Sequence, residues 1–135
     1  GKRTMHTLNA YMVFKNDKPY LVGATPGGDR QIAWNAQVIS NVTDHGLDPQ
    51  EAVEAPRWTS TPGTDPANVD DPFVLELEGG MAIEEVAKLK AKGHEVDVKE
   101  TGGYGGSVKL IMIDPETGVR IAGSDPRTDG HAAVV

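Results

Sequence analysis

A Pro-Gly-Gly turn between an apolar run and a helix-patterned run constrains this chain more than any other feature. Residues 20–24 are apolar and β-prone, residues 25–30 read Thr-Pro-Gly-Gly-Asp-Arg, and residues 31–45 carry the spacing of a helix. Glycines leave the backbone N–H groups accessible, and at the start of a helix those groups lie at the positive end of the helix dipole. Such a turn can bind a phosphate or stabilise an oxyanion that forms during a reaction. The simpler alternative is a tight turn in which Asp29 caps the helix.

The composition excludes several classes of protein. The 135 residues correspond to about one domain, and we expect a single domain over residues 1–135. A net charge of −7 argues against nucleic acid and against an anionic membrane as partners. No apolar stretch approaches the roughly 20 residues that span a bilayer. The absence of cysteine excludes disulfides and thiolate chemistry, and it leaves the compartment open between cytoplasm and periplasm.

The hydrophobic pattern predicts strands and clustered helices. Strands are expected at residues 10–15, 20–25, 73–77, 94–99, 108–113 and 119–123, and helices at residues 31–45, 48–55 and 82–92. Residues 58–72, rich in Thr, Pro, Gly and Asp, are expected to form a surface loop. Because the helices do not follow every strand, we expect an α+β layered sandwich with mostly antiparallel sheets and packed helices.

Two finer expectations concern burial. The first two strands are largely apolar, which favours a sheet that is covered on both faces. The helix at residues 31–45 has a broad apolar arc, which predicts a buried helix. One stripe of this arc is led by Ile32, and a neighbouring stripe contains Trp34, Val38 and Val42.

Other candidate sites fit their chemistry poorly. The glycine-rich residues 102–107 precede a strand rather than a helix and carry no Walker lysine, so we expect a flexible loop near a pocket. The four histidines lack metal-ligand spacing, and we expect no metal and no other cofactor. Ser124, Asp125 and Arg127 lack the nucleophile elbow and an identifiable base of a serine hydrolase.

A polar pair, His6-Thr7, precedes the first predicted hairpin. Because the hairpin folds back, this pair can lie near Gly27 and Gly28 at neighbouring ends of the sheet. An imidazole and a hydroxyl can both donate hydrogen bonds to a substrate carboxylate or carbonyl. We therefore expect His6 and Thr7 to be substrate-binding residues.

Several separate motifs resemble the small subunit of gamma-glutamyltransferases. They are Gly1-Lys2-Arg3 with a following polar pair, Pro-Gly-Gly-Asp-Arg at residues 26–30, the helix pair at residues 44–57, Lys-Ala-Lys-Gly-His at residues 90–94 and Gly-Ser-Asp-Pro-Arg at residues 123–127. They occur in the order of the family and cover essentially the whole chain. The chain is thus similar to this family throughout its length.

The resemblance implies an N-terminal-nucleophile hydrolase with an α-β-β-α sandwich, made by self-cleavage of a precursor. In that family the first residue of the small subunit, a threonine, attacks a gamma-glutamyl amide, and its own α-amine serves as base. The acyl group then passes to water or to an acceptor amine. The family's oxyanion hole matches Gly27 and Gly28, which the resemblance therefore implies as catalytic residues.

Two departures from the family matter. Gly1 has no nucleophilic side chain and the family's threonine lies well upstream, so the chain matches the C-terminal portion of a small subunit. We expect this piece to be inactive without its upstream part. In addition, the family usually has a Ser-Ser pair that helps to bind the glutamyl end of the substrate, where this chain has His6-Thr7. That difference fits a divergent amidohydrolase or acylase of the same fold.

The sequence therefore indicates an amide hydrolase or acyltransferase whose nucleophile lies outside residues 1–135. The expected partners are the rest of the precursor (the large subunit and the N-terminal part of the small subunit) and a small gamma-glutamyl or other amide substrate. The alternative is a non-catalytic domain that keeps the fold. The upstream sequence separates the two, because it shows whether a threonine stands at the cleavage point.

Overall fold

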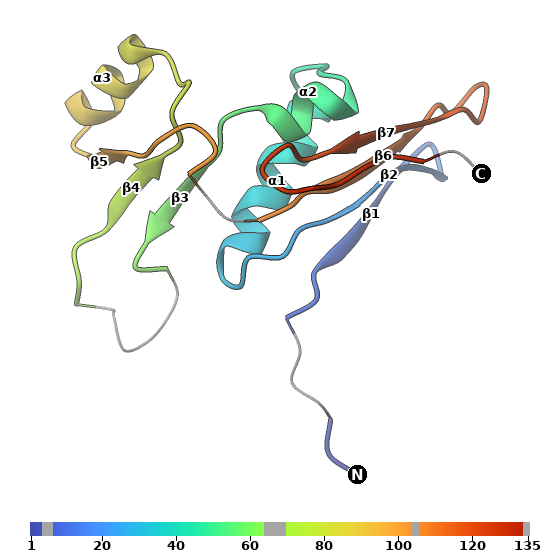
Figure 1. Ribbon diagram of the computed structural model, residues 1–135, viewed down its shortest axis with the longest axis horizontal. Helices are drawn as coiled ribbons and strands as arrows, with labels where there is room; N and C mark the ends of the chain where they lie inside the picture. Colours follow the sequence, from blue (N-terminus) through green and yellow to red (C-terminus); the bar gives the residue numbers. More distant parts are fainter. Residues whose placement is uncertain (4–6, 64–69, 104–105, 134–135) are drawn as a thin grey trace.

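The computed structural model describes residues 1–3, 7–63, 70–103 and 106–133, which form seven strands and three helices. Figure 1 shows two sheets side by side, with α1 and α2 packed on the larger sheet and α3 beside the smaller one. The elements are β1 (Ala10–Lys15), β2 (Lys18–Ala24), α1 (Arg30–Thr43), α2 (Pro49–Glu54), β3 (Trp58–Thr61), β4 (Val74–Leu77), α3 (Ile83–Ala91), β5 (Glu95–Val98), β6 (Lys109–Ile113) and β7 (Arg120–Ser124).

The sheets are mostly antiparallel. The larger one has the order β1-β2-β6-β7 with every pair antiparallel, and the smaller has the order β3-β4-β5. Only β4 and β5 run parallel, because α3 connects them as a crossover. The α+β class predicted from the sequence is therefore confirmed.

The first hairpin turns tightly at Asn16 and Asp17. Both residues have positive φ, 53° and 60°, and they connect Lys15 to its strand partner Lys18. Asn and Asp tolerate this conformation, which matches the twist of the two strands. The hairpin returns β2 directly into the Pro-Gly-Gly turn and α1.

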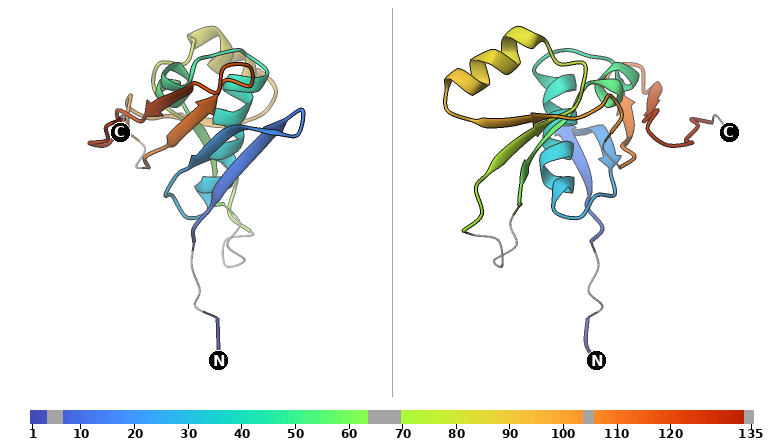
Figure 2. Two further views of the ribbon diagram at one scale, coloured as in Figure 1. Left: turned by 90° about the vertical axis from the view of Figure 1, so that its right-hand side faces the viewer. Right: turned by 60° about the vertical axis from the view of Figure 1, so that its left-hand side comes forward.

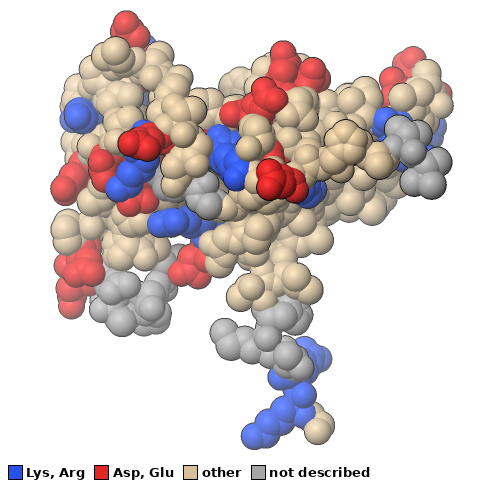
Figure 3. Space-filling model, viewed as in Figure 1, with Lys and Arg blue, Asp and Glu red and all other residues tan. Residues whose placement is uncertain are grey.

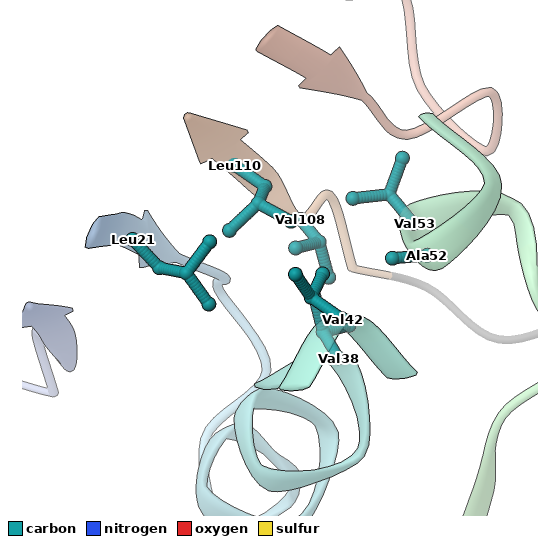
Figure 4. Packing of buried hydrophobic residues seen from close by; sticks show 7 residues of the cluster. All are labelled: Leu21, Val38, Val42, Ala52, Val53, Val108 and Leu110. Atoms are coloured by element: carbon teal, nitrogen blue, oxygen red, sulfur yellow. The ribbon is translucent and has the colours of Figure 1, made fainter. Parts of the chain in front are cut away.

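The hydrophobic core lies between the larger sheet and the two helices on its one face. Figure 4 shows side chains from β2, β6, α1 and α2 converging there. The cluster consists of Leu21, Val38, Val42, Ala52, Val53, Val108 and Leu110, none more than 5% exposed. This packing fixes α1, the helix that follows the glycine turn, on the sheet to which β2 belongs.

The predicted buried stripe of α1 is wrong in one respect. Ile32, which leads one stripe, is 72% exposed, whereas Trp34, Val38 and Val42 are buried. The two stripes lie next to each other on the helix, and the stripe that packs against the sheet is the one that contains Val38 and Val42.

The opposite face of the larger sheet is open within the described chain. Met12 and Phe14 on β1 are 50% and 60% exposed. Val22 on β2 pairs with Met12 on one side and with Ile111 of β6 on the other, so Met12 and Ile111 share this face. Figure 2 shows α1 crossing only the other face. The expectation of two covered faces is thus met on one face only, since both helices pack on the same side.

The expectation of a loop over residues 58–72 is wrong at its start. Trp58–Thr61 forms β3 and pairs antiparallel with β4. A side chain of α1 also forms hydrogen bonds with the backbone of this strand. Gln37 Nε2 donates to the Trp58 carbonyl at 2.9 Å, and the Trp58 N–H donates to Gln37 Oε1 at 2.9 Å. Residues 64–69 lie outside the described part of the chain.

The two shorter helices begin as the sequence indicates. Asp48 and Glu51 form a reciprocal capping box at the start of α2. Ala82 is the N-cap of α3 and offers no capping side chain. In the described ranges, no helix has the length and apolar character needed to cross a membrane.

Candidate active site

The glycine turn joins β2 to α1 and presents backbone N–H groups. Gly27 and Gly28 have φ of 150° and 56°, and their carbonyls accept the first N–H groups of the helix, from Arg30 at 3.2 Å and Gln31 at 3.1 Å. Asp29 occupies the N-cap position, but its side chain makes no capping hydrogen bond. Within the described residues, the N–H groups of Gly27 and Gly28 donate to no protein acceptor. They are therefore available to a ligand.

Cavities flank this turn on more than one side. Thr7 and Gly27 line one of about 420 Å³, together with Ser107 and Lys109. Gly28 lines a second, of about 470 Å³, with Asn9 and Asp29. The structure thus brings Thr7 and the glycine turn together, as the fold of the hairpin led us to expect. His6 lies outside the described residues.

Trp34 packs directly under the turn. A Cβ added to Gly27 would lie 2.7 Å from Trp34 Cζ3, which is too close for a real side chain. The indole is buried, and the Cζ atom of Arg57 lies 4.9 Å from its ring centroid. Arg57 in turn belongs to a buried ion cluster behind the site.

The ion cluster consists of Arg57, Glu78, Asp125 and Arg127. Arg57 Nη2 lies 2.9 Å from Asp125 Oδ2, and Arg127 Nη1 lies 3.0 Å from Asp125 Oδ1. Arg127 also donates two hydrogen bonds to Glu78, from Nε to Oε1 at 2.7 Å and from Nη2 to Oε2. The two guanidinium groups and the two carboxylates together carry no net charge, and each buried charge has a partner of the opposite sign.

Backbone groups complete the cluster and set its protonation. The Val108 N–H donates to Asp125 Oδ2 at 3.0 Å, and the Arg57 N–H donates to Glu78 Oε2 at 2.9 Å. Burial alone raises the pKa of Glu78 and of Asp125, but these hydrogen bonds and the two guanidinium groups more than reverse it, so that each pKa lies below its ordinary value. The cluster is therefore ionised at neutral pH.

The sequence did not indicate this cluster as a unit. Arg57 precedes β3, Glu78 follows β4 and Asp125 follows β7. None of them lies inside an element whose periodicity would assign it to the interior. The only signal was that Arg57, Asp125 and Arg127 belong to the two motifs, residues 44–57 and 123–127, on which the family resemblance rests.

Among the residues that the structure describes, the remaining sequence candidates do not assemble into another site; residues 104 and 105 of the glycine-rich segment lie outside them. The Ser124 hydroxyl accepts from Lys109 Nζ at 3.2 Å, while Asp125 is committed to the ion cluster, so no serine triad forms. Across the described ranges, no three metal-ligating side chains come together. Figure 3 shows acidic and basic side chains interspersed over one face rather than gathered into a single basic patch.

Comparison with known proteins gives one consistent family. The family model described as gamma-glutamyltranspeptidase matches residues 1–135. The glutathione hydrolase-like YwrD proenzyme of Bacillus subtilis is 37% identical, over 97% of this chain and 24% of its own length. The chain thus spans about a quarter of the length of that relative.

Solved structures show the same fold. Gamma-glutamyltranspeptidase of Helicobacter pylori matches with a TM-score of 0.76 and 32% identity, over 94% of this chain and 64% of that chain. Cephalosporin acylase of Bacillus halodurans matches with a TM-score of 0.77 and 34% identity, over 90% of this chain and 21% of that chain. The described elements are accordingly part of an N-terminal-nucleophile hydrolase fold. The chain belongs to the gamma-glutamyltranspeptidase family.

Proposed function

We propose that this chain supplies the oxyanion hole and part of the substrate pocket of an amide hydrolase or acyltransferase of the gamma-glutamyltranspeptidase type. The observation that carries the proposal is the pair of N–H groups of Gly27 and Gly28, which have no protein acceptor among the described residues. They lie at the start of α1, and cavities adjoin both glycines.

The chemistry follows from the charge that develops in acyl transfer. Attack on an amide carbonyl places negative charge on its oxygen, and fixed N–H donors at a helix N-terminus stabilise that charge without reorganising. Losing one such donor typically costs on the order of 10²–10³ in rate. The nucleophile in this proposal is a threonine upstream of residue 1, with its α-amine as base, and the acyl group passes to water or to an amine.

Thr7 and His6 are the proposed substrate-binding pair. Thr7 lines the cavity beside Gly27, and its hydroxyl can donate to a carbonyl or carboxylate of the bound substrate. His6 precedes it in the sequence and would add an imidazole donor. The pair would orient the scissile carbonyl toward the glycine turn.

The rest of the precursor is the proposed partner. The open face of the larger sheet presents Met12, Phe14 and Ile111, an apolar surface that a second layer can bury. A second sheet on this face would complete the α-β-β-α sandwich. The net charge of −7 makes nucleic acid an unsuitable partner.

A second candidate function is an amidohydrolase or acylase that does not act on glutamyl groups. The observation that favours it is the His6-Thr7 pair, which replaces the serine pair usual in the family. The likeness to cephalosporin acylase of Bacillus halodurans supports it further. Both candidates use the same glycine turn and differ in the acyl group that the pocket accepts.

The decisive experiment uses the full-length precursor. Its self-cleavage is followed by mass spectrometry, and the cleaved protein is assayed on a gamma-glutamyl anilide and on simple acyl amides, with and without an acceptor amine. Turnover of the glutamyl anilide supports the first candidate, and turnover of acyl amides alone supports the second. Self-cleavage without turnover of any amide would overturn both, and absence of cleavage and turnover together would favour a non-catalytic domain.

A further inference from the structure

Trp34 is the largest fully buried side chain in the described residues, yet it lies outside the hydrophobic core cluster. It is 1% exposed and belongs to α1, about one helical turn after the first residue of that helix, Arg30. An aromatic ring of this size would normally pack among aliphatic side chains. Its neighbours include two glycine backbones and a guanidinium, so the ring has contacts besides those of core filling.

Two glycine backbones from distant parts of the chain meet the same atom of this ring. A Cβ on Gly27 would lie 2.7 Å from Trp34 Cζ3, and a Cβ on Gly106 would lie 2.5 Å from it. Gly27 belongs to the turn before α1, and Gly106 to the glycine-rich segment before β6. The indole therefore separates these two backbones and fixes how closely they approach.

A third contact holds the ring in place. The Arg57 guanidinium stacks on Trp34 with its Cζ atom 4.9 Å from the ring centroid, and Asp125 fixes that guanidinium at 2.9 Å. A desolvated cation over an indole is a favourable contact, stronger than at an exposed site. The ring is thus clamped between the ion cluster and the glycine turn.

We propose that Trp34 is a positioning residue that sets the place of the Gly27 N–H relative to the backbone of Gly106. The inference rests on the proposed function, because it assigns Trp34 a part in stabilising the oxyanion without touching substrate. Oxyanion donors act within a narrow range, about 2.7–3.1 Å from the developing charge. A smaller side chain leaves a void under Gly27, and the turn can then relax away from that range.

The kinetic test uses Trp34→Leu and Trp34→Phe in the full-length, self-cleaved protein. We expect Trp34→Leu to lower kcat on the order of 10²-fold, as misplacements of about 1 Å do, with KM nearly unchanged. Trp34→Phe keeps an aromatic ring next to Gly27, and its kcat should therefore stay close to that of the wild-type protein. Val53→Ala, a truncation in the core on α2, is the control for lost stability and should keep kcat. A rise in KM with kcat unchanged, or equal losses in Trp34→Leu and Val53→Ala, would overturn the proposal.

A second test does not depend on catalysis. Gly106→Ala should lower the unfolding temperature for two reasons: its φ of 111° is unfavourable for alanine, and its Cβ meets the indole. Trp34→Leu makes room for that Cβ, so the loss should be smaller in the Trp34→Leu background, where only the contribution of φ remains. If Gly106→Ala alone does not fold, the proposal still predicts that the double variant Gly106→Ala with Trp34→Leu yields folded protein. Equal losses in both backgrounds would overturn the positioning role. Because this cycle is scored by unfolding, it remains decisive even if the wild-type protein turns over no amide and the proposed function fails.

Discussion

Arg127 and Glu78 form a two-pronged ion pair in the interior, although 49 residues separate them in the sequence. The same guanidinium donates from Nη1 to the Val53 carbonyl at 2.9 Å, and so ties the end of α2 to the strands. The cluster therefore connects three segments that are separate in the sequence: the residue before β3, the residue after β4 and the residues after β7.

Removing Arg127 should destabilise the protein strongly. Arg127→Met leaves Glu78 without its side-chain partner in a site where the carboxylate is fully buried. Breaking a buried pair in this way costs about 3–5 kcal/mol, mostly because the remaining charge is uncompensated. Chemical unfolding of the full-length protein measures the loss. Lys88→Met breaks the exposed pair with Glu85 and should cost less than about 1 kcal/mol; similar losses for both variants would contradict the role of burial.

The cluster should also make stability fall in acid. The folded pKa of Glu78 and of Asp125 lies below the ordinary values of about 4.3 and 3.9, so the unfolded chain binds protons first as the pH falls. Their contribution is complete above those ordinary values, and it is lost as the pH falls toward the folded pKa of each group. Unfolding measured between about pH 3 and 7 should show this loss. Asp125→Asn should be less stable at neutral pH but lose less on acidification, and an unchanged slope would count against the assignment.

The two aspartates at helix N-termini should differ in their effect on stability. Asp48 accepts the Glu51 N–H at 2.8 Å within a capping box, whereas Asp29 makes no capping hydrogen bond. Replacing a capping side chain with Ala typically costs about 0.5–2 kcal/mol. We expect Asp48→Ala to show a loss in this range on thermal unfolding and Asp29→Ala to show little. A larger loss for Asp29→Ala would mean that its carboxylate stabilises the turn by another contact.

Local signals in the sequence were sufficient for much of the fold. The strand, Pro-Gly-Gly turn and helix at the site, the first hairpin and the short helix predicted at residues 48–55 all depend on neighbours within a few residues. The structure has each of them where the pattern placed it, to within a few residues at the ends.

What the sequence could not show depends on partners far along the chain. β3 is short and polar, and it is stabilised by pairing with β4 and by the Gln37 side chain of α1. Ile32 fits an apolar stripe, but its burial is decided by where the sheet lies. The ion cluster joins residues up to 70 positions apart, and the contact of Trp34 with Gly27 and Gly106 depends on backbone approach, which no pattern of side chains encodes.

A side chain at Gly27 should weaken catalysis more than stability alone explains. In Gly27→Ala the new Cβ would meet Trp34 Cζ3 at 2.7 Å, and a φ of 150° is unfavourable for alanine, so the backbone must shift. The shift moves the N–H that we propose as an oxyanion donor, and kcat on an amide should fall on the order of 10²-fold. Gly118→Ala is the matched control, because its φ of 74° is also positive, its Cβ meets open space, and it lies in the turn between β6 and β7. Steady-state kinetics and unfolding temperatures of both variants separate the two effects: comparable kcat values for Gly27→Ala and Gly118→Ala would remove Gly27 from the oxyanion hole.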